Sequence, residues 1–555
     1  MSDKEDKNDE KGKSVLTQLS SLETERSSWA GEVADAMELV IPNRSNMEVS
    51  TSTPTYTKST TRKDGTAASS LKLFANGLLG NVCPQRLTWF KTQMENYKAQ
   101  KASGVAEYMD DITSFFYHMF NGSSFYTGAW QVFMDGGGSG LGTMYMGEDL
   151  KNQKIDFLAY EPKGIYIATD EKGKIDTNFQ RFIYTARDIV KKYGEDKLTK
   201  TFIDNYKKRP YTRHEVVQGV FPREDRDIFK MDAINMEFAS LHVLKTGSKL
   251  LRESGYNSFP YAHWRYEYGS GEVYPWSPTL TGFPDIERLN TINGDTTRLS
   301  HLAAYPPVMV PAEMYGDFRI EPRFKVPGYD MSRKPEPLLF GQGYGVAKDQ
   351  VEMYQQIVKE HYFTNFFLML SAAAGTNMTA TQVLEMQGEK ATVIGGMVAR
   401  LTQEFFDPLF DRIFMIAAKN GWIPEPPEAL LALGGDISID YMGPLSMAQK
   451  RMLELSGPMN AIENFLPVAQ AYPEMRHLIK PYETGKQILI GGGMPHANIR
   501  EERDYNQLVE AEQKQLQEAA QTEQIEKEAG ALQKGSKKPE EGSPSELVMA
   551  GMQNG

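Results

Sequence analysis

The stretch Thr379-Ala380-Thr381-Gln382-Val383-Leu384-Glu385 opens a helix-compatible run that continues to about Asn420. At 1.5 Å per residue, a run of roughly 40 residues would span about 60 Å, which is long for a globular core. Glycine is flexible and proline removes a backbone hydrogen bond, so kinks are expected at Gly388, Gly395-Gly396 and Pro408. Apolar residues recur along the run at intervals of three and four and predict one packed face: Ile394, Val398, Leu401, Phe405, Leu409, Ile413 and Ile416.

A segment of small residues lies directly before this run. It consists of Ser371, Ala372, Ala373, Ala374, Gly375, Thr376 and Asn377, and its composition predicts a flexible loop. The preceding residues, Val346–Leu370, have a helical pattern. Two helices joined by such a loop could line an opening rather than build a catalytic pocket. A bent helix within an ordinary core is the alternative interpretation.

Length and composition indicate a soluble folded protein. The chain has 555 residues, of which 40% are apolar and 24% charged, and its length suggests two to four domains. No apolar run approaches the roughly 20 residues that cross a bilayer, and no secretory signal is visible. Cys83 is the only cysteine, so an intramolecular disulfide and a cysteine-based zinc site are both excluded within one chain, which fits a reducing compartment.

The net charge of −12 bears on nucleic acid as a partner. A protein that grips DNA through its phosphates needs a basic face. The acidic balance of the whole chain therefore predicts brief contact and little sticking, rather than tight wrapping of DNA.

The N-terminal part of the chain is predicted to be mostly helical. Residues 1–14 are polar and are expected to form a disordered arm. Helical patterns follow over Val15–Ile41, at about 65–79, and over 102–135. The glycine-rich segment Gly136–Gly140 is expected to be a loop.

The middle of the chain is predicted to be rich in β-strands. Residues 143–185 alternate between apolar and polar side chains, with a hairpin turn at Asp170–Lys174, and residues 212–275 are also strand-like. A helix follows at about 283–304. The proline- and glycine-rich residues 306–343 can form only short strands and turns. The sequence thus predicts an α+β fold that is mostly helical.

Motifs of catalysis or nucleotide binding are incomplete. Gly136–Gly142 lacks the lysine of a phosphate-binding loop, and Gly12-Lys13-Ser14 has Lys7 where the first glycine of that motif should be. Ser139 comes closest to a Gly-x-Ser-x-Gly elbow, but Leu141 replaces the last glycine. The eight histidines are scattered. We therefore expect no enzyme activity, no cofactor and no metal.

Two further clusters have structural alternatives. Lys207-Lys208-Arg209, with Arg213 and His214, could contact DNA or another protein, although a run of charges is usually a solvated face. Alternation places three aromatic residues on one side of a strand, where core or subunit packing is favoured over base stacking: Trp264, Tyr266 and Tyr268.

Several segments together resemble one family. Near the N-terminus these are Trp29, Pro42–Arg44, Asp64–Thr66, Leu78–Gly80 and Trp89-Phe90. Later segments are Glu253–Tyr256, Trp264-Arg265, Thr379–Glu385, Gly395, Leu401, Glu404, Pro408, Arg412, Gly443–Leu445 and Ala448–Lys450. Their order resembles the portal protein, or head-to-tail connector, of short-tailed, podovirus-type bacteriophages, over about residues 15–510.

The sequence departs from that family at two of these places. Tyr274 is followed by Pro275 and Trp276 where the family usually has Tyr-Gly. Gly65 stands where the family tends to have Ser or Thr.

The resemblance implies a ring, expected to be a dodecamer, around a DNA channel at one vertex of the capsid. It implies the following parts: a disordered arm (1–14), a wing (15–282), stem helices (283–305 and 346–370), a clip (306–345), a tunnel loop (371–378), a long kinked helix returning to the wing (379–444), a helical crown (445–530) and a disordered tail (531–555). The tunnel loop, Ser371–Asn377, would contact DNA through steric and polar groups. Lys348, Lys359 and Lys390 are candidates to face phosphates.

Partners follow from the same resemblance. They are further copies of the chain, capsid and scaffolding proteins, the large subunit of terminase, tail adaptor proteins and double-stranded DNA, with no membrane. The protein would assemble in the host cytoplasm and reside in the virion. A virion scaffold or tail adaptor without a channel is the alternative, followed by an enzyme of the packaging complex.

Overall fold

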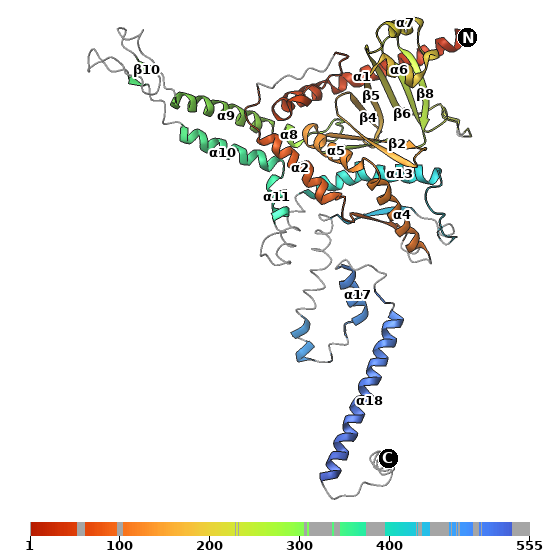
Figure 1. Cartoon of the computed structure of the whole chain (residues 1–555), viewed down its shortest axis with the longest axis vertical. Coiled ribbons are helices and arrows are strands. Elements are labelled where there is room, and N and C mark those ends of the chain that lie inside the picture. Colours follow the sequence, from red (N-terminus) through yellow and green to blue (C-terminus); the bar gives the residue numbers. More distant parts are fainter. Residues whose placement is uncertain are drawn as a thin grey trace. The chain divides into compact units, whose positions relative to one another are not determined.

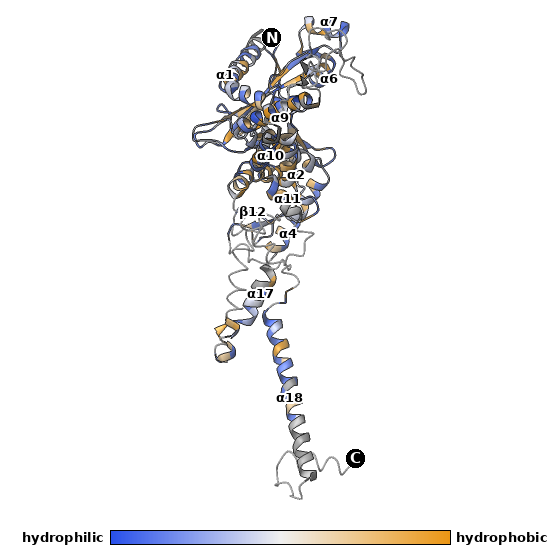
Figure 2. Ribbon diagram, turned by 90° about the vertical axis from the view of Figure 1, so that its left-hand side faces the viewer, coloured by the Kyte–Doolittle hydropathy of each residue, from blue (hydrophilic) through white to orange (hydrophobic). Residues whose placement is uncertain are grey.

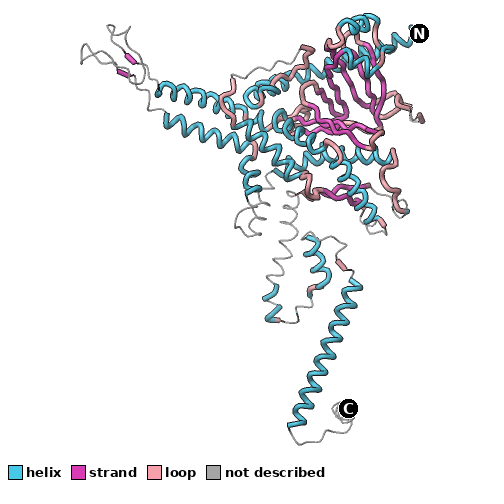
Figure 3. The backbone as a smooth tube through the Cα atoms, in the orientation of Figure 1, coloured by secondary structure: helices cyan, strands magenta, loops and turns pink. Residues whose placement is uncertain are grey.

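The computed structural model divides the chain into two compact units, residues 1–449 and 450–555, which we treat separately. The described residues are 2–52, 61–96, 104–227, 229–230, 232–304, 308–309, 336–337, 344–372, 394–428, 430, 436–443, 465–467, 469–472, 474, 478–491, 499–500 and 502–534. The fold is mixed α+β, mostly helical with several antiparallel sheets, as predicted (Figures 1 and 3).

A five-stranded antiparallel sheet of unit 1 has the order β4-β5-β6-β7-β8. Its strands are β4 (Ile165–Thr169), β5 (Ile175–Thr185), β6 (Arg213–Pro222), β7 (Phe238–Leu244) and β8 (Lys249–Tyr256). The predicted hairpin turn at Asp170–Lys174 joins β4 and β5, with the Asp170 amide donating to the Lys174 carbonyl at 2.8 Å.

Helices cover both faces of this sheet. Because side chains alternate along a strand, Val217 and Val243 pack under α1 (Ser2–Val40), whereas Val216 and Leu244 pack on the opposite face. That opposite face is covered by α6 (Ala186–Tyr193) and α7 (Lys200–Lys208).

Helix α1 begins at Ser2, so the prediction of a disordered arm over residues 1–14 is wrong. The polar N-terminal turns dock on β8: Lys11 Nζ lies 2.9 Å from a Glu253 carboxylate oxygen, and Lys249 Nζ lies 3.3 Å from Asp9 Oδ1. Gly12 lies so close to the Ser248 backbone that a Cβ atom would overlap it. A charged sequence here reflects docking on a polar strand edge rather than disorder.

A three-stranded sheet of order β3-β2-β9 lies beside the main apolar core. Its strands are β2 (Leu141–Asp149), β3 (Lys154–Tyr160) and β9 (Tyr261–Arg265). The core is formed with the helices α2 (Thr66–Val82), α4 (Val105–Asn121) and α5 (Phe125–Ser139).

Residues Gly136–Ser139 form the last turn of α5, so the prediction of a glycine loop beginning at Gly136 is wrong. Side chains there would collide with the neighbours of α5. A Cβ on Gly136 would overlap the Trp264 ring, and one on Gly137 would lie 2.6 Å from Leu71 Cδ1. The glycines therefore permit close packing of a helix, and Gly140, with φ of +92°, ends it.

The second half of the predicted long helix is present. Residues 394–401 are helical, a π-helical turn follows at Thr402–Phe406 (η6), and α13 (Asp407–Lys419) ends at the predicted Asn420. The π turn directly precedes Pro408, where an irregularity was predicted. Residues 373–393, including Thr379–Glu385 and Lys390, lie outside the described residues.

A two-stranded sheet that the sequence did not predict pairs β1 (Phe90–Met94) with β12 (Ile437–Tyr441). The Met442 amide adds a hydrogen bond of 2.7 Å to the Trp89 carbonyl. This pairing ties the segment after α13 to the N-terminal third of the chain.

Unit 1 also carries a helical hairpin, which we call the arm. It consists of α9 (Phe283–Ala304), as predicted at 283–304, and α10 (Tyr344–His361). The short helix α8 (Pro278–Thr281) precedes the arm, and α11 (Thr364–Ala372) follows it. The sequence predicted one helix over Val346–Leu370, but the helix is interrupted at Tyr362-Phe363, where Phe363 has φ of +53°.

The described part of the predicted clip contains one antiparallel pair, β10 (Val308–Met309) with β11 (Glu336–Pro337). These strands are as short as the many prolines predicted. The remaining residues of 305–343 lie outside the described part of the chain.

In unit 2, the main described helices are α17 (Pro481–Gly491) and α18 (Glu502–Lys534). Hydrophilic residues are prominent on α18 in Figure 2. Because α18 extends to Lys534, the predicted disordered tail begins too early at residue 531. Within the described ranges, no helix is both long and apolar enough to cross a membrane.

Candidate functional site: the helical arm

The arm contains most of the residues predicted as stem helices, and α11 leads from it to the start of the predicted tunnel loop. Helices α9 and α10 run antiparallel and side by side, away from the sheets (Figures 1 and 3). Arg288 bridges the two helices by donating to the Tyr354 hydroxyl at 3.1 Å. At the base of the arm, His361 Nε2 lies 2.9 Å from Asp285 Oδ2.

A buried hydrogen-bond chain fixes the base of the arm to α5. The Thr279 hydroxyl donates to the Gly137 carbonyl at 2.8 Å and lies 2.8 Å from the Tyr362 hydroxyl. Since the Thr279 proton is committed to Gly137, the Tyr362 hydroxyl must be the donor to Thr279. Burial raises the pKa of Tyr362, which keeps that proton in place.

Hydroxyl groups near the base of the arm also provide hydrogen bonds for the last backbone carbonyls of α5. The last carbonyls of a helix have no partner within the helix. Ser277 donates to the Gly138 carbonyl at 2.8 Å and also caps α8 by accepting from the Leu280 amide at 3.0 Å. Ser277 therefore joins the glycine-rich end of α5 to the start of α8.

A second anchor joins α9 to the loop before α2. Asn290 accepts from the Lys63 amide at 2.6 Å and donates to the Thr61 carbonyl at 3.0 Å. Asn293, one turn later, donates to the Lys63 carbonyl at 2.8 Å. The Asp64 carboxylate accepts from the Thr66 amide at 2.7 Å and so stabilises the start of α2. The segment Asp64–Thr66 thus has a structural role.

Helix α11 continues from the arm along α2. Phe366 and Phe367 are buried, and the Phe367 ring lies against Gly77, where a Cβ atom would overlap it. Phe74 contacts the same ring edge-on, with centroids 6.2 Å apart. This packing fixes the direction in which the chain enters the predicted tunnel loop.

The structure places only part of the predicted site. Ser371 and Ala372 belong to the last turn of α11, so the predicted loop begins at least two residues too early. Alanine favours helix, which explains the extension. Ala373, Ala374, Gly375, Thr376, Asn377 and Lys390 lie outside the described residues.

The two described lysines of the predicted site lie on α10. Lys348 is exposed, with its Nζ 3.7 Å from Glu352 Oε1, and Lys359 is half-buried. Together α9 and α10 contain six Asp/Glu and four Lys/Arg residues, so the arm has a formal charge of −2. A surface ion pair of this kind contributes little to stability, and it moderates the charge of Lys348.

The motif residues of the long helix have structural roles. Arg265 is buried and contacts the Glu404 carboxylate at 2.7 and 3.2 Å. Tyr268 contacts two guanidinium groups, with its ring centroid 3.8 Å from Arg265 Cζ and 4.6 Å from Arg400 Cζ. Arg412 donates to the Ser258 hydroxyl at 2.7 Å. These contacts lock the π-helical turn and α13 onto the three-stranded sheet.

Sequence reasoning missed the anchors of the arm. Thr279, Tyr362, Asn290 and Asn293 were not singled out. Asn290 and Asn293 are three residues apart, so they share one face of α9 and could have indicated a polar contact along it. The Ser277-Pro278 pair is a typical helix start. Nothing in the sequence indicates that their partners are Lys63 and the end of α5.

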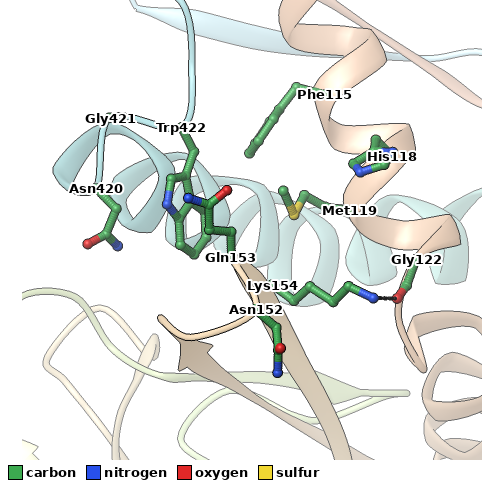
Figure 4. A pocket seen from close by; sticks show the side chains of 10 residues that line it. All are labelled: Phe115, His118, Met119, Gly122, Asn152, Gln153, Lys154, Asn420, Gly421 and Trp422. Carbon is green, nitrogen blue, oxygen red and sulfur yellow. Dashed lines mark hydrogen bonds between the residues drawn. The ribbon is translucent and has the colours of Figure 1, made fainter.

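A cavity of about 450 Å³ lies between the ends of α4 and α13 and the β2–β3 turn (Figure 4). Its lining residues are Phe115, His118, Met119, Gly122, Asn152, Gln153, Lys154, Asn420, Gly421 and Trp422. Lys154 donates to the Gly122 carbonyl at 3.3 Å. The lining has no carboxylate, hydroxyl or thiol side chain. No metal-ligating cluster occurs among the residues that the structure describes.

Unit 1 thus consists of an α+β body that anchors a projecting helical arm. The family model described as bacteriophage head to tail connecting protein matches residues 12–499. The chain belongs to this family, which is structural rather than enzymatic.

Two relatives are described as a portal protein and a probable portal protein. The chain is 26% identical over 448 residues to the portal protein of Salmonella phage epsilon15, covering 79% of each protein. It is 24% identical over 479 residues to the probable portal protein of Bordetella phage BPP-1, covering 83% of this chain and 84% of that protein. These matches confirm the family resemblance predicted from the sequence motifs.

Proposed function

We propose that this chain is the subunit of a portal ring at one vertex of a phage capsid, through which DNA is packaged, retained and ejected. The observation that carries the proposal is the family match over residues 12–499, together with two portal relatives that align over most of their length. The expected ring is a dodecamer, with the arm and the loop after α11 facing the channel.

The exposed surface of the arm supports assembly into a ring. Met353 is 51% exposed and Leu302 is 37% exposed. The solvent-facing side of a helix in a soluble monomer usually carries polar residues instead. Packing between α9 and α10 leaves both of these side chains exposed. Neighbouring arms in a ring would cover them.

The charge of the arm supports passage of DNA without capture. With a formal charge of −2, the arm repels phosphates weakly, and salt screens that repulsion beyond about 10 Å. Lys348, Lys359 and Lys390 remain candidates for transient phosphate contacts. The large terminase subunit would dock at the outer end of the ring during packaging, and tail adaptors would replace it. Capsid and scaffolding proteins would contact the wing.

Imaging of the purified protein tests the ring. Electron microscopy, with a mass measurement of the intact particle, is expected to show a closed ring of about twelve copies with a hole that admits duplex DNA. A solid particle or a stable monomer at micromolar concentration would overturn the proposal in favour of a scaffold or tail adaptor without a channel.

The tunnel loop has its own test. Deleting residues 373–377, the part of the predicted loop beyond α11, should leave ring assembly largely intact while reducing packaging or retention of DNA. A matched variant replaces the same residues with a glycine–serine loop of equal length, which separates loop length from its side chains. Normal packaging and retention in the deletion variant would refute the role of this loop.

A further inference from the structure

A basic cap lies on the outer face of the five-stranded sheet. We define the cap as Ala186–His214, which contains α6, α7 and the turn into β6. It has nine Lys/Arg and four Asp/Glu residues, a formal charge of +5 in a chain whose total is −12. Figure 1 shows α6 and α7 on the side of unit 1 that is opposite the arm. Local charge of this sign and density is the footprint of a polyanion site.

The cations of the cap are available for binding. The side chains of Lys200, Lys207, Lys208 and Arg209 are all exposed. None of the four takes part in an ion pair within the described part of the chain. Asp204 is four residues from both Lys200 and Lys208 on α7, but no ion pair joins it to either lysine.

The cap holds these cations on a rigid support. Phe202 of α7 and Ile189 of α6 are buried against Val216, Leu244 and Leu251 of the sheet. The Thr185 and Thr199 side chains cap the two helices by accepting from the Asp188 and Phe202 amides. Cations on fixed helices lose less conformational freedom on binding than cations on a loose tail.

Helix stability explains only part of this charge. Lys207 and Lys208 lie in the last turn of α7, where cations stabilise the helix dipole. Lys200 lies in the first turn, where a cation is unfavourable and where α7 has no acidic residue. Lys200 and Lys208 share the exposed face of α7, since they are eight residues apart. A binding role accounts for the position of Lys200 at the start of the helix, which the helix dipole disfavours.

We propose that this cap binds the phosphate backbone of double-stranded DNA without reading its sequence. Single strands are normally held by rows of exposed aromatic rings, but in the cap only Tyr211, at 69%, is among the strongly exposed large side chains. Cations on a helix and its following turn instead suit the regularly spaced phosphates of a duplex. This site is separate from the arm and does not depend on the proposed channel.

Binding of a labelled duplex of about 30 base pairs to the full-length protein tests this site, measured by fluorescence anisotropy at two salt concentrations. The test variant carries Lys200→Gln, Lys207→Gln, Lys208→Gln and Arg209→Gln. The matched control neutralises four exposed lysines elsewhere: Lys151→Gln, Lys154→Gln, Lys172→Gln and Lys174→Gln.

The test variant is expected to bind at least about tenfold more weakly and to show a shallower dependence on salt, because each lost phosphate contact reduces the slope by about one. The control should bind as the unmodified protein does. Equal weakening in both variants would overturn the site, since only total charge would matter. Binding of polyglutamate in place of DNA would overturn it in favour of an acidic protein partner. Sedimentation of each variant verifies that folding and assembly are unchanged, so that this result stands apart from the test of the ring.

Discussion

The core of unit 1 and the arm are held by different kinds of interaction. In the core, aromatic rings pack on one another: the Trp89 centroid lies 5.2 Å from that of Phe406, and Phe410 lies 4.6 Å from Phe90. The base of the arm shares this apolar core through Ile286, Leu289 and Val358. It is additionally held by directional hydrogen bonds, such as those of Thr279 and Asn290. Apolar packing supplies most of the stability, whereas hydrogen bonds fix orientation. The arm is thus oriented precisely while its surface stays open to other molecules.

The largest effect is expected in the core. Phe405 is fully buried, so Phe405→Ala should lower the free energy of unfolding by about 3–5 kcal/mol. Leu302→Ala on the arm is the matched comparison, because Leu302 is 37% exposed and should cost less than about 1 kcal/mol in the free subunit. Chemical denaturation measures both. Similar losses in the two variants would remove the contrast between core and arm.

The ion pair between core and long helix should come next. Glu404→Ala leaves the buried Arg265 guanidinium without its carboxylate and should cost about 3 kcal/mol. The double variant Arg265→Met/Glu404→Leu removes both charges and should recover much of that loss. A double variant as unstable as Glu404→Ala would show that packing, not the unpaired charge, sets the cost.

Asp135 of α5 gives a pH-dependent contribution. Its carboxylate is buried beside Arg44, whose Nη1 lies 2.5 Å away, and burial raises the pKa of Asp135 to about 7. That pKa lies above the unfolded value of about 3.9, so the folded state binds more protons between these values and loses stability as pH rises.

Relative to Asp135→Asn, the unmodified protein should therefore lose up to about 1.4 kcal/mol per pH unit between about pH 4 and 7. Denaturation of both proteins across this range measures the difference. A constant difference, or one of opposite sign, would contradict the raised pKa.

The smallest effect is expected in the arm. Tyr362→Phe removes the donor to Thr279 and should cost about 1 kcal/mol. It should also speed hydrogen exchange in α9 and α10 more than in α5, because orientation is affected more than packing. Tyr211→Phe, at a 69% exposed position, is the control and should change neither property. Faster exchange throughout unit 1 would indicate that the arm and the core unfold together.

Local patterns predicted much of the fold. The helix at 283–304 and the turn at Asp170–Lys174 were correct, because apolar spacing and turn residues are local signals. The predictions of a loop at Gly136–Ser139 and of disorder at residues 2–14 were wrong, because glycine content and charge were taken as signs of irregular structure. There, contacts with Trp264 and with β8 decide the conformation.

The candidate site was less predictable than the fold. The family motifs indicated the right class, but not that Glu404 and Arg412 bind Arg265 and Ser258. The anchors of the arm depend on partners far away in sequence, such as Asn290 with Lys63. No spacing rule can supply such a pairing from one sequence.

The sheet formed by β1 and β12 has a consequence for synthesis on the ribosome. Ser438 contacts the backbone of Gln93 across a separation of 345 positions. Translation proceeds at roughly 5–20 residues per second, so the apolar edge around Trp89 and Phe90 must wait tens of seconds for its closing strand. During that interval the nascent chain exposes an unpaired strand and an aromatic surface, and it would be a natural client for host chaperones.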